Sequence, residues 1–434
     1  MTDTIYAPSS AIGGAIAVIR ISGPEAGRAG ELFHRNFTKQ PGMLRHGRLM
    51  DGDRLVDDCM VVFFPGPGSY TGEDMVEINC HGGIVTVRQI LSLLSRLGFR
   101  PAGPGEFTRR AFENGKMDLS QAEAVMDVVT AGAERSLQAA LRQLSGSVKS
   151  AVTDMEEGLM DALSGIDAAI DYPDEAEEDT VEHLPEALSR VKSLLEETIL
   201  EGRRGRVLRD GIQVVILGQP NVGKSSLLNR LLGEERAIVT DIPGTTRDLL
   251  NESTVIEGVP VRFLDTAGIR EGADAVERIG VARARAAAET ADMILLVLDG
   301  SQPLQEEDAA LLEQTADSKR ILVANKMDLG YRLELAEPTV PISAKEGRGI
   351  RELQQAILEK VGAVGAGEPI ITNERHLHAL ERALEALCQA HVSPELELAA
   401  TDIREALGCL GQITGSSVDE AVIDRIFERF CVGK

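Results

Sequence analysis

One stretch constrains the fold more than any other, an apolar run at residues 214–217 that continues into GQPNVGKS at residues 218–225. A buried strand that ends in a glycine loop and is followed by a helix, here over residues 226–232, is the build of a phosphate cradle. The spacing G-x-x-x-x-G-K-S is that of a P-loop. In such a loop, Lys224 reaches the β- and γ-phosphates and Ser225 holds Mg²⁺. We therefore expect a nucleoside triphosphate site here.

Further nucleotide-contacting segments follow in order along the chain. Residues 261–264 predict a short strand that delivers DTAG, in which Asp265 takes a Mg²⁺-bound water and the Gly268 N–H meets a γ-phosphate. Between this strand and the P-loop lies GTTRD, whose Thr246 hydroxyl completes the Mg²⁺ shell. Loops of this kind order around the γ-phosphate and relax after hydrolysis, so this segment is predicted to be a switch.

Two later segments predict which base is bound. A strand over residues 320–324 presents NKMD, and the carboxylate of Asp328 can accept hydrogen bonds from N1–H and the 2-amino group of guanine. Adenine offers neither donor, and a buried acceptor left unpaired is strongly penalised. After residues 340–342, a backbone N–H in the segment 343–345 can meet guanine O6. The sequence therefore predicts a GTP site.

Length and composition restrict the rest of the chain. At 434 residues it should hold two to four domains. Five cysteines without a C-x-x-C pair argue against a disulfide framework and a zinc cluster, and fit a reducing cytosol. No basic residue precedes Arg20, and the longest strongly apolar run is residues 293–298. We therefore expect that the chain has neither a signal peptide nor a membrane span. We also expect a cytoplasmic location.

The formal charge of −24 bears on partners. Proteins that bind nucleic acid without a partner usually carry a basic surface. If RNA is the substrate of this acidic chain, a partner or a local basic patch must supply the cations. The acidic cluster at residues 171–179 is most simply a solvated loop between helices. The basic cluster Arg203, Arg204, Arg206 and Arg209 is either a solvated linker or an RNA contact.

Differences in residue pattern along the chain predict four segments. Residues 1–118, with short β-type runs between glycines and prolines, should form a mixed α+β domain. Residues 119–210 and 363–434 show helical periodicity and flank an α/β nucleotide domain at 211–362, which is therefore inserted into an all-α domain.

Capping boxes are predicted at two helix starts. Ser120 with Glu123 should open the first long helix, and Ser417 with Glu420 the last. The last helix would deliver Cys431 close to the C-terminus, where a helix end disfavours a thiolate unless a cation such as Lys434 helps. Cys431 is alternatively a small buried apolar residue at a chain end.

Several of these segments together resemble the bacterial tRNA-modification GTPases of the MnmE (TrmE) family, within the TrmE-Era-EngA-YihA-Septin-like GTPases. The resemblance rests on FCVGK at residues 430–434, GQPNVGKSSLLN at 218–229, DIPGTTRD at 241–248 and PGEF at 104–107. It covers the chain from end to end. The only departure noticed in the terminal pentapeptide is Val432, where the family usually has isoleucine.

The resemblance implies an N-terminal domain that looks like tetrahydrofolate-binding enzymes, dimerises, and holds a 5-formyl- or 5,10-methylene-tetrahydrofolate donor. The matching folate contacts are Arg20, Glu77, Lys116 and Lys434. With the FAD-containing partner MnmG, in a heterotetramer, the family converts C5 of the wobble uridine (U34) of certain tRNAs to a carboxymethylaminomethyl or aminomethyl derivative. Cys431 matches the proposed catalytic cysteine, whose thiolate would add to C6 of uracil and make C5 nucleophilic.

The resemblance also implies how GTP is hydrolysed. Ras-type enzymes place a water-orienting Gln just after D-x-x-G, whereas this chain has Ile269. In the family a K⁺ ion takes the place of an arginine finger, and Glu277 matches the water-orienting residue. The matching K⁺ ligands are Asn221, Thr240, Ile242 and Thr245. Asn221 has an alternative role, a hydrogen bond within its own turn. Arg247 joins Glu277 and Cys431 as a candidate catalytic residue.

The complete predicted GTP site comprises Asn221, Val222, Gly223, Lys224, Ser225, Ser226, Thr240, Asp241, Ile242, Pro243, Gly244, Thr245, Thr246, Asp265, Thr266, Ala267, Gly268, Asn325, Lys326, Asp328, Ser343, Ala344 and Lys345. Ser225 and Thr246 are the predicted Mg²⁺ ligands. Two functional classes remain: an enzyme that couples GTP hydrolysis to tRNA modification, and a regulatory or ribosome-assembly GTPase that only switches partner binding.

Overall fold

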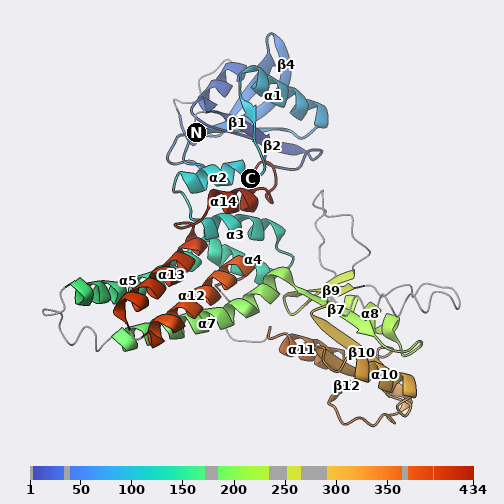
Figure 1. Cartoon of the computed structure of the whole chain (residues 1–434). Coiled ribbons are helices and arrows are strands. Elements are labelled where there is room, and N and C mark those ends of the chain that lie inside the picture. Colours follow the sequence, from blue (N-terminus) through green and yellow to red (C-terminus); the bar gives the residue numbers. More distant parts are fainter. Residues whose placement is uncertain are drawn as a thin grey trace. The chain divides into compact units, whose positions relative to one another are not determined.

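Figure 1 shows the computed structural model of the chain. The structure describes residues 3–33, 40–171, 184–233, 252–264, 291–363, 370–393 and 395–434. It forms two compact units. The first is Met1–Met126 with Leu410–Lys434, and the second is Asp127–Cys409. The domain boundaries that we expect at residues 118, 210 and 362 stay predictions.

The first unit is built on a six-stranded sheet with the order β3-β4-β5-β2-β1-β6. All neighbours are antiparallel except β1 and β6. The strands are β1 (Ile5–Pro8), β2 (Ile16–Ser22), β3 (Arg45–Asp51), β4 (Arg54–Phe64), β5 (Met75–His81) and β6 (Arg100–Pro101). Its helices are η1 (Ala26–Phe33), α1 (Ile84–Arg96), α2 (Glu106–Glu113) and α14 (Glu420–Phe427). The α+β class predicted for this region is confirmed.

Alternation along β2 decides which side chains face the core of this unit. Ala17, Ile19 and Ile21 are fully buried in a cluster that includes residues of α1. Because successive side chains of a strand point to opposite faces, Arg20 lies on the other side of the sheet. Its cross-strand neighbour on β5 is Glu77, which shares that face.

The C-terminal segment packs in the same unit. Phe427 and Phe430 are buried in a cluster with Leu119 and Ala122. The prediction that Ser417 caps the last helix is wrong: α14 begins at Glu420, two residues later than a Ser417 cap would place it, with Asp419 at the N-cap. The helix ends at Phe427, so Cys431 does not lie at its last turn but in the extended tail beyond it.

Long helices form much of the second unit. They are α4 (Glu134–Leu144), α5 (Ser147–Asp171), α7 (Leu184–Asp210) and α12 (Glu374–Val392), while α3 (Leu119–Thr130) and α13 (Leu396–Thr414) belong partly to each unit. The predicted capping box of α3 is displaced. Asp118 is the cap, because its carboxylate accepts from the Gln121 N–H at 3.0 Å and the Gln121 side chain accepts from the Asp118 N–H at 3.0 Å. Ser120 lies inside the helix and donates to Asp118.

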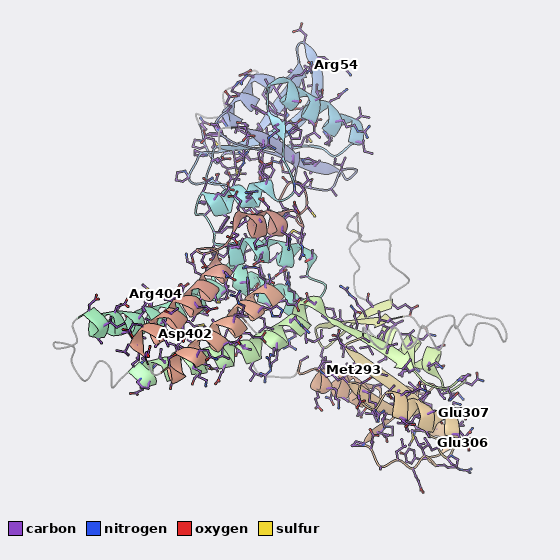
Figure 2. The ribbon with its side chains drawn as sticks, in the orientation of Figure 1. Arg54, Met293, Glu306, Glu307, Asp402 and Arg404 are labelled. Atoms are coloured by element: carbon purple, nitrogen blue, oxygen red, sulfur yellow. The ribbon has the colours of Figure 1, made fainter. Side chains whose placement is uncertain are left out.

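Ion pairs link these helices. Three of the four arginines of the basic cluster are paired: Arg203 with Glu381 at 2.9 Å, Arg206 with Glu374 at 3.2 Å, and Arg209 with Asp127 at 2.8 Å. In Figure 2, Asp402 and Arg404 are labelled on α13, and Arg404 binds both carboxylate oxygens of Asp167 on α5, at 2.8 and 3.0 Å.

The nucleotide-type part of the second unit is a six-stranded sheet with the order β12-β11-β10-β7-β9-β8. Only the β8–β9 pair is antiparallel. The elements are β7 (Ile212–Leu217), α8 (Lys224–Leu232), β8 (Glu252–Ile256), β9 (Val259–Leu264), β10 (Met293–Asp299), α10 (Glu306–Gln314), β11 (Arg320–Asn325), η2 (Met327–Leu329), β12 (Thr339–Pro341) and α11 (Ile350–Lys360).

Two features of this sheet follow from its sequence. The first six residues of β10, which opens with Met293 (Figure 2), form a continuous run of buried apolar residues, as expected for a parallel strand covered on both faces. Glu306 and Glu307 lie in the first turn of α10, where negative charge complements the helix dipole. The predicted all-α and P-loop α/β classes are confirmed. In the part of the chain that is described, no helix is both long enough and apolar enough for a membrane span.

Candidate functional site

The glycine loop after β7 is tightly fitted. Gly223 has φ +99° and serves as the N-cap of α8. A Cβ atom at this position would lie 2.3 Å from the Asn325 side-chain nitrogen. Gly218 is similarly confined, because its Cβ would lie 2.2 Å from the Val297 carbonyl oxygen. Any side chain at these two positions would clash with Val297 or Asn325. Only glycine therefore allows the loop to pack this closely against its neighbours with its backbone N–H groups free for a phosphate.

Asn325 joins the glycine loop to the base-recognition segments. Its Nδ2 donates to the Val222 carbonyl at 2.8 Å, and its Oδ1 accepts from the Ala344 N–H at 3.0 Å. The side chain is buried, with 3% exposure. A buried amide whose nitrogen and oxygen both form hydrogen bonds is held rigidly. Asn325 therefore links three motifs that are distant in sequence, and we call it the Asn325 anchor.

Lys224 lies over the glycine loop at the start of α8. Its Nζ donates to the carbonyls of Gly218 and Gln219 at 2.8 and 2.7 Å. Burial lowers the pKa of Lys224, because removing the ammonium from water disfavours its charged form. A phosphate arriving here would restore an anionic partner to this ammonium.

The carboxylate of Asp328, the predicted base-recognition residue, is held by the turn after β12. Ser343 Oγ donates to Asp328 Oδ1 at 2.7 Å, and this hydrogen bond lowers the pKa of Asp328. The carboxylate is therefore ionised at neutral pH and able to accept from a base. The neighbouring Lys326 has φ +67° and forms an ion pair with Asp299 at 2.7 Å.

Asp299 is a residue that sequence reasoning missed. Burial by itself would raise its pKa, but hydrogen bonds from Lys326 and Ser301 outweigh that effect and lower it. A sequence signal does exist, since Asp299 ends β10 and pairs in register with Asn325 at the end of β11. Residues that end adjacent parallel strands meet at one edge of a sheet.

The other described GTP candidates surround this anchor. Val222 is buried, whereas Asn221, Ser225 and Ser226 are exposed, and Asn221 has φ +63°. Lys345 is exposed in the turn that contains Ser343 and Ala344. The remaining candidates lie outside the described residues: Thr240, Asp241, Ile242, Pro243, Gly244, Thr245, Thr246, Arg247, Asp265, Thr266, Ala267, Gly268 and Glu277. The acidic cluster from residue 172 onward also lies outside them.

A second group of predicted residues lies on the sheet of the first unit. Arg20 donates from Nε and Nη2 to the same oxygen of Glu77, at 2.9 and 2.8 Å. The guanidinium carbon lies 5.1 Å from the centre of the Tyr70 ring and 5.7 Å from that of Phe107. The structure thus brings the two predicted residues Arg20 and Glu77 together as an ion pair. The two aromatic rings beside Arg20 were not among the residues predicted from the sequence.

Lys116 and Lys434 have different surroundings. Lys116 Nζ donates to the Pro67 carbonyl at 2.8 Å. The Lys434 N–H donates to the Cys431 carbonyl at 3.3 Å, which closes a turn at the end of the chain.

The tail that carries Cys431 is seated against two N-terminal segments. The Gly105 N–H donates to the Cys431 carbonyl at 3.3 Å, and Val432 bridges to Pro104. Gly433 has φ +97°, and a Cβ there would lie 2.1 Å from the Pro8 carbonyl oxygen. Pro8 pairs with Ile19, the residue before Arg20. The tail therefore contacts β1 one position along the β1–β2 pair from Arg20, whose own partner is Ala7.

Comparison with known proteins decides the family. The chain matches the family model of the MnmE helical domain over residues 119–431 and that of the GTP-binding protein TrmE N-terminus over residues 4–116. The chain belongs to the MnmE family of tRNA modification GTPases. The match confirms the resemblance predicted from FCVGK and the P-loop, and with it a GTP hydrolase of tRNA modification.

Relatives in the MnmE family match over their whole length. The "tRNA modification GTPase MnmE" of Natranaerobius thermophilus is 43% identical, covering 100% of this chain and 99% of the relative. That of Bacillus subtilis is 42% identical, covering 100% of both. Among solved structures, the FeoB G-domain from Methanococcus jannaschii is 26% identical over 35% of this chain and 98% of that chain, with a TM-score of 0.26.

Proposed function

We propose that this chain is a K⁺-dependent GTPase that modifies C5 of the wobble uridine (U34) of certain tRNAs. It acts with an MnmG-type FAD protein and uses a tetrahydrofolate one-carbon unit to form carboxymethylaminomethyl- or aminomethyluridine. The observation that carries the proposal is the seating of the Cys431 tail against Pro104 and Gly105 and against Pro8, which pairs with the residue before Arg20. A cysteine held in place next to the strand that carries the Arg20–Glu77 pair has a chemical task that a pure switch would not need.

The GTPase half rests on the geometry around Asn325. Lys224 exchanges its loop carbonyls for phosphate oxygens, and Asp328 accepts from the guanine edge. Ser225, exposed at the start of α8, and Thr246 would hold Mg²⁺, which neutralises charge on the phosphates. Asn221, exposed on a loop with φ +63°, and the oxygens of Thr240, Ile242 and Thr245 would hold K⁺. In this proposal Glu277 orients the attacking water, a role that Ile269 cannot fill, and Arg247 is a further catalytic residue.

The one-carbon half rests on the chemistry around Arg20. A folate carries a heterocycle and ends in glutamyl carboxylates, and the Tyr70 ring beside the Arg20 cation suits both parts. Glu77 offers an acceptor for the donor edge of the pterin, and Lys116 and Lys434 offer cations for the carboxylates. The folate supplies the one-carbon unit, and these residues bind and orient it.

Cys431 is the nucleophile in this proposal. Its thiolate would add to C6 of uracil and place the electron pair at C5; the folate would supply the methylene carbon that C5 accepts, and an amine co-substrate would replace the folate nitrogen on that carbon, which releases tetrahydrofolate. Loss of the C5 proton and expulsion of the thiolate restore the ring. Burial raises the pKa of Cys59 to about 12 and that of Cys80 to about 11, so these thiols remain protonated and do not compete.

Two partners are needed. The net charge of −24 opposes tRNA binding by the chain alone, so the FAD protein would supply much of the cationic surface. The second partner is another copy of this chain. Ile12, Ile16, Ile84 and Val85 are 44–70% exposed and lie close together, since the Gly13 N–H donates to Gly82 at 2.8 Å and Ile16 pairs with His81. An apolar patch of this kind is typical of a homodimer interface.

The test is Cys431→Ser, with Cys388→Ser as the matched control in the half-exposed cysteine of α12. Cells that lack the wild-type chain are complemented with each variant, and tRNA wobble nucleosides are measured by mass spectrometry. We expect Cys431→Ser to lose the modified uridine while the purified protein keeps its GTP hydrolysis rate, and Cys388→Ser to keep both. If Cys431→Ser restores modified uridine fully, the thiol is not the nucleophile and a regulatory switch becomes the better description.

A further inference from the structure

One contact of the nucleotide region lies outside its recognised motifs. Arg230 lies in the last turn of α8, and its guanidinium reaches the turn at residues 343–348. Nε donates to the Ala344 carbonyl at 3.3 Å, and Nη2 donates to the Lys345 carbonyl at 3.0 Å. The helix that begins at the P-loop is thereby tied to the turn that follows β12.

The rest of this turn is organised around Ser343. The Ser343 N–H donates to the Arg348 carbonyl at 2.9 Å, and the Gly347 N–H donates to the Ser343 carbonyl at 2.8 Å. Ser343 Oγ accepts from the Glu346 N–H at 3.2 Å. Arg230, which is not part of this turn, donates hydrogen bonds to the carbonyls of the two residues that follow Ser343.

Gly347 lies beside this guanidinium, at ordinary van der Waals distance. A Cβ atom on Gly347, which has φ +80°, would lie 3.5 Å from the Arg230 guanidinium carbon. Arginine offers a planar fork of donors, so it can hold two successive carbonyls in a fixed relation where lysine would hold a single point.

The orientation of the peptide between Ala344 and Lys345 follows from this grip. In a trans peptide the C=O and N–H bonds point in opposite directions, so a carbonyl directed at Arg230 turns the Lys345 N–H away from it. The preceding N–H, that of Ala344, is fixed by Asn325. Arg230 and Asn325 therefore hold successive peptides of this turn from its two sides.

We propose that Arg230 is a positioning residue for guanine recognition. It fixes the Ala344–Lys345 peptide so that its N–H is presented to the oxygen at position 6 of the base. Asp328 accepts from the neighbouring N1–H and 2-amino group of the base, and its own contact in this turn is with Ser343 and not with Arg230. The inference rests on guanine nucleotide binding, which the proposed function also requires.

The test separates recognition of the oxygen at position 6 from recognition of the 2-amino group with three ligands. Dissociation constants for GDP, IDP and 6-thio-GDP are measured by calorimetry with Mg²⁺ on the full chain. IDP lacks the 2-amino group that Asp328 reads, and 6-thio-GDP replaces the oxygen at position 6 by sulfur, a weaker acceptor. The variants are Arg230→Ala and, as matched control, Arg348→Ala. Arg348 is an exposed arginine of the same turn that pairs with Glu346 instead of a carbonyl.

We expect Arg230→Ala to weaken GDP binding by about 3- to 10-fold, the usual range for losing hydrogen bonds from a charged donor at a partly exposed site. The penalty for 6-thio-GDP relative to GDP should shrink, while the penalty for IDP should stay as in the wild type. Arg348→Ala, which removes the same charge, should leave all three constants nearly unchanged.

Two results would overturn the inference. One is an Arg230→Ala variant that binds GDP as tightly as Arg348→Ala does. The other is an Arg230→Ala variant that loses affinity with both penalties unchanged, since that would indicate a loss of general stability or charge. A wild-type chain that binds no GDP would instead contradict the proposed function, so the two failures are distinguishable.

Discussion

At the scale of single residues, we predict that the pair of His81 and Asp57 makes stability depend on pH. His81 Nδ1 lies 2.7 Å from Asp57 Oδ1, and the same carboxylate accepts from the His81 N–H at 2.9 Å. The hydrogen bond to Asp57 raises the pKa of His81 above its ordinary 6.5. A pKa that is higher in the folded state contributes stability that is fully present below the unfolded pKa and is lost as pH rises through the folded pKa.

We therefore expect the urea midpoint of the wild type to fall more between about pH 6 and about pH 9 than that of His81→Gln. NMR titration should also show the His81 pKa moving down toward 6.5 in Asp57→Asn, because the anionic partner is gone. Equal pH slopes in the wild type and His81→Gln would show that the pair adds nothing. The side chain of His81 is largely exposed, so we predict the direction of the effect and attach no energy to it.

At the scale of elements, the seat of the C-terminal segment depends on one turn. Gly105 has φ +63°, and a Cβ there would lie 2.8 Å from Phe430 Cβ and 2.9 Å from the Phe427 carbonyl oxygen. Gly98 has φ +89° but open space around its missing Cβ. Gly98→Ala should cost about 1 kcal/mol, the backbone strain alone, and Gly105→Ala about 1–3 kcal/mol more because the buried contact is overpacked.

Chemical denaturation of both variants measures this difference. Displacement of the tail should also speed alkylation of Cys431 in Gly105→Ala relative to Gly98→Ala, because the bond from the Gly105 N–H to the Cys431 carbonyl would be broken. Equal stability and equal alkylation rates in the two variants would mean that the turn does not seat the tail.

The same scale shows how far sequence reasoning reaches. Three strands could be predicted because each of the motifs that follow them requires a strand to end immediately before it. They are β7 before the P-loop, β11 leading into NKMD, and β12 before residue 343. The first turns of α3 and α14 were predicted wrongly. An acidic residue close to each expected serine, Asp118 or Asp419, takes the N-cap position instead, and a local pattern cannot rank two neighbouring caps.

Contacts between distant segments were beyond the sequence. Arg230 with Ala344, Arg20 with Tyr70, and Gly105 with Phe430 depend on topology, and no spacing rule links their positions. The residues of the Asn325 anchor were predicted one motif at a time. That a single amide bridges the glycine loop and the Ala344 turn could only be read from the structure.

At the scale of the whole molecule, the proposed dimer and the proposed K⁺ dependence should be separable from nucleotide binding. Charges placed in the apolar patch, Ile16→Glu with Val85→Glu, would oppose pairing of two copies because a buried interfacial carboxylate lacks a partner. Both side chains are exposed, at 66% and 70%, so the fold of one copy should tolerate them. Sedimentation should show a monomer whose GDP affinity equals that of the wild type.

Hydrolysis is where the variant should differ. If two nucleotide domains must close face to face to order the loops that hold K⁺, the wild type should hydrolyse GTP faster in KCl than in NaCl, and the charged variant should be slow in both salts. Leu55→Glu, which also charges an exposed apolar residue of the first unit, at 50% exposure, is the control and should stay dimeric and K⁺-stimulated. A monomeric variant that keeps full stimulation by K⁺ would show that the cation acts within one copy, and equal rates in the two salts would remove K⁺ from the proposal while leaving the guanine site and the thiol untouched.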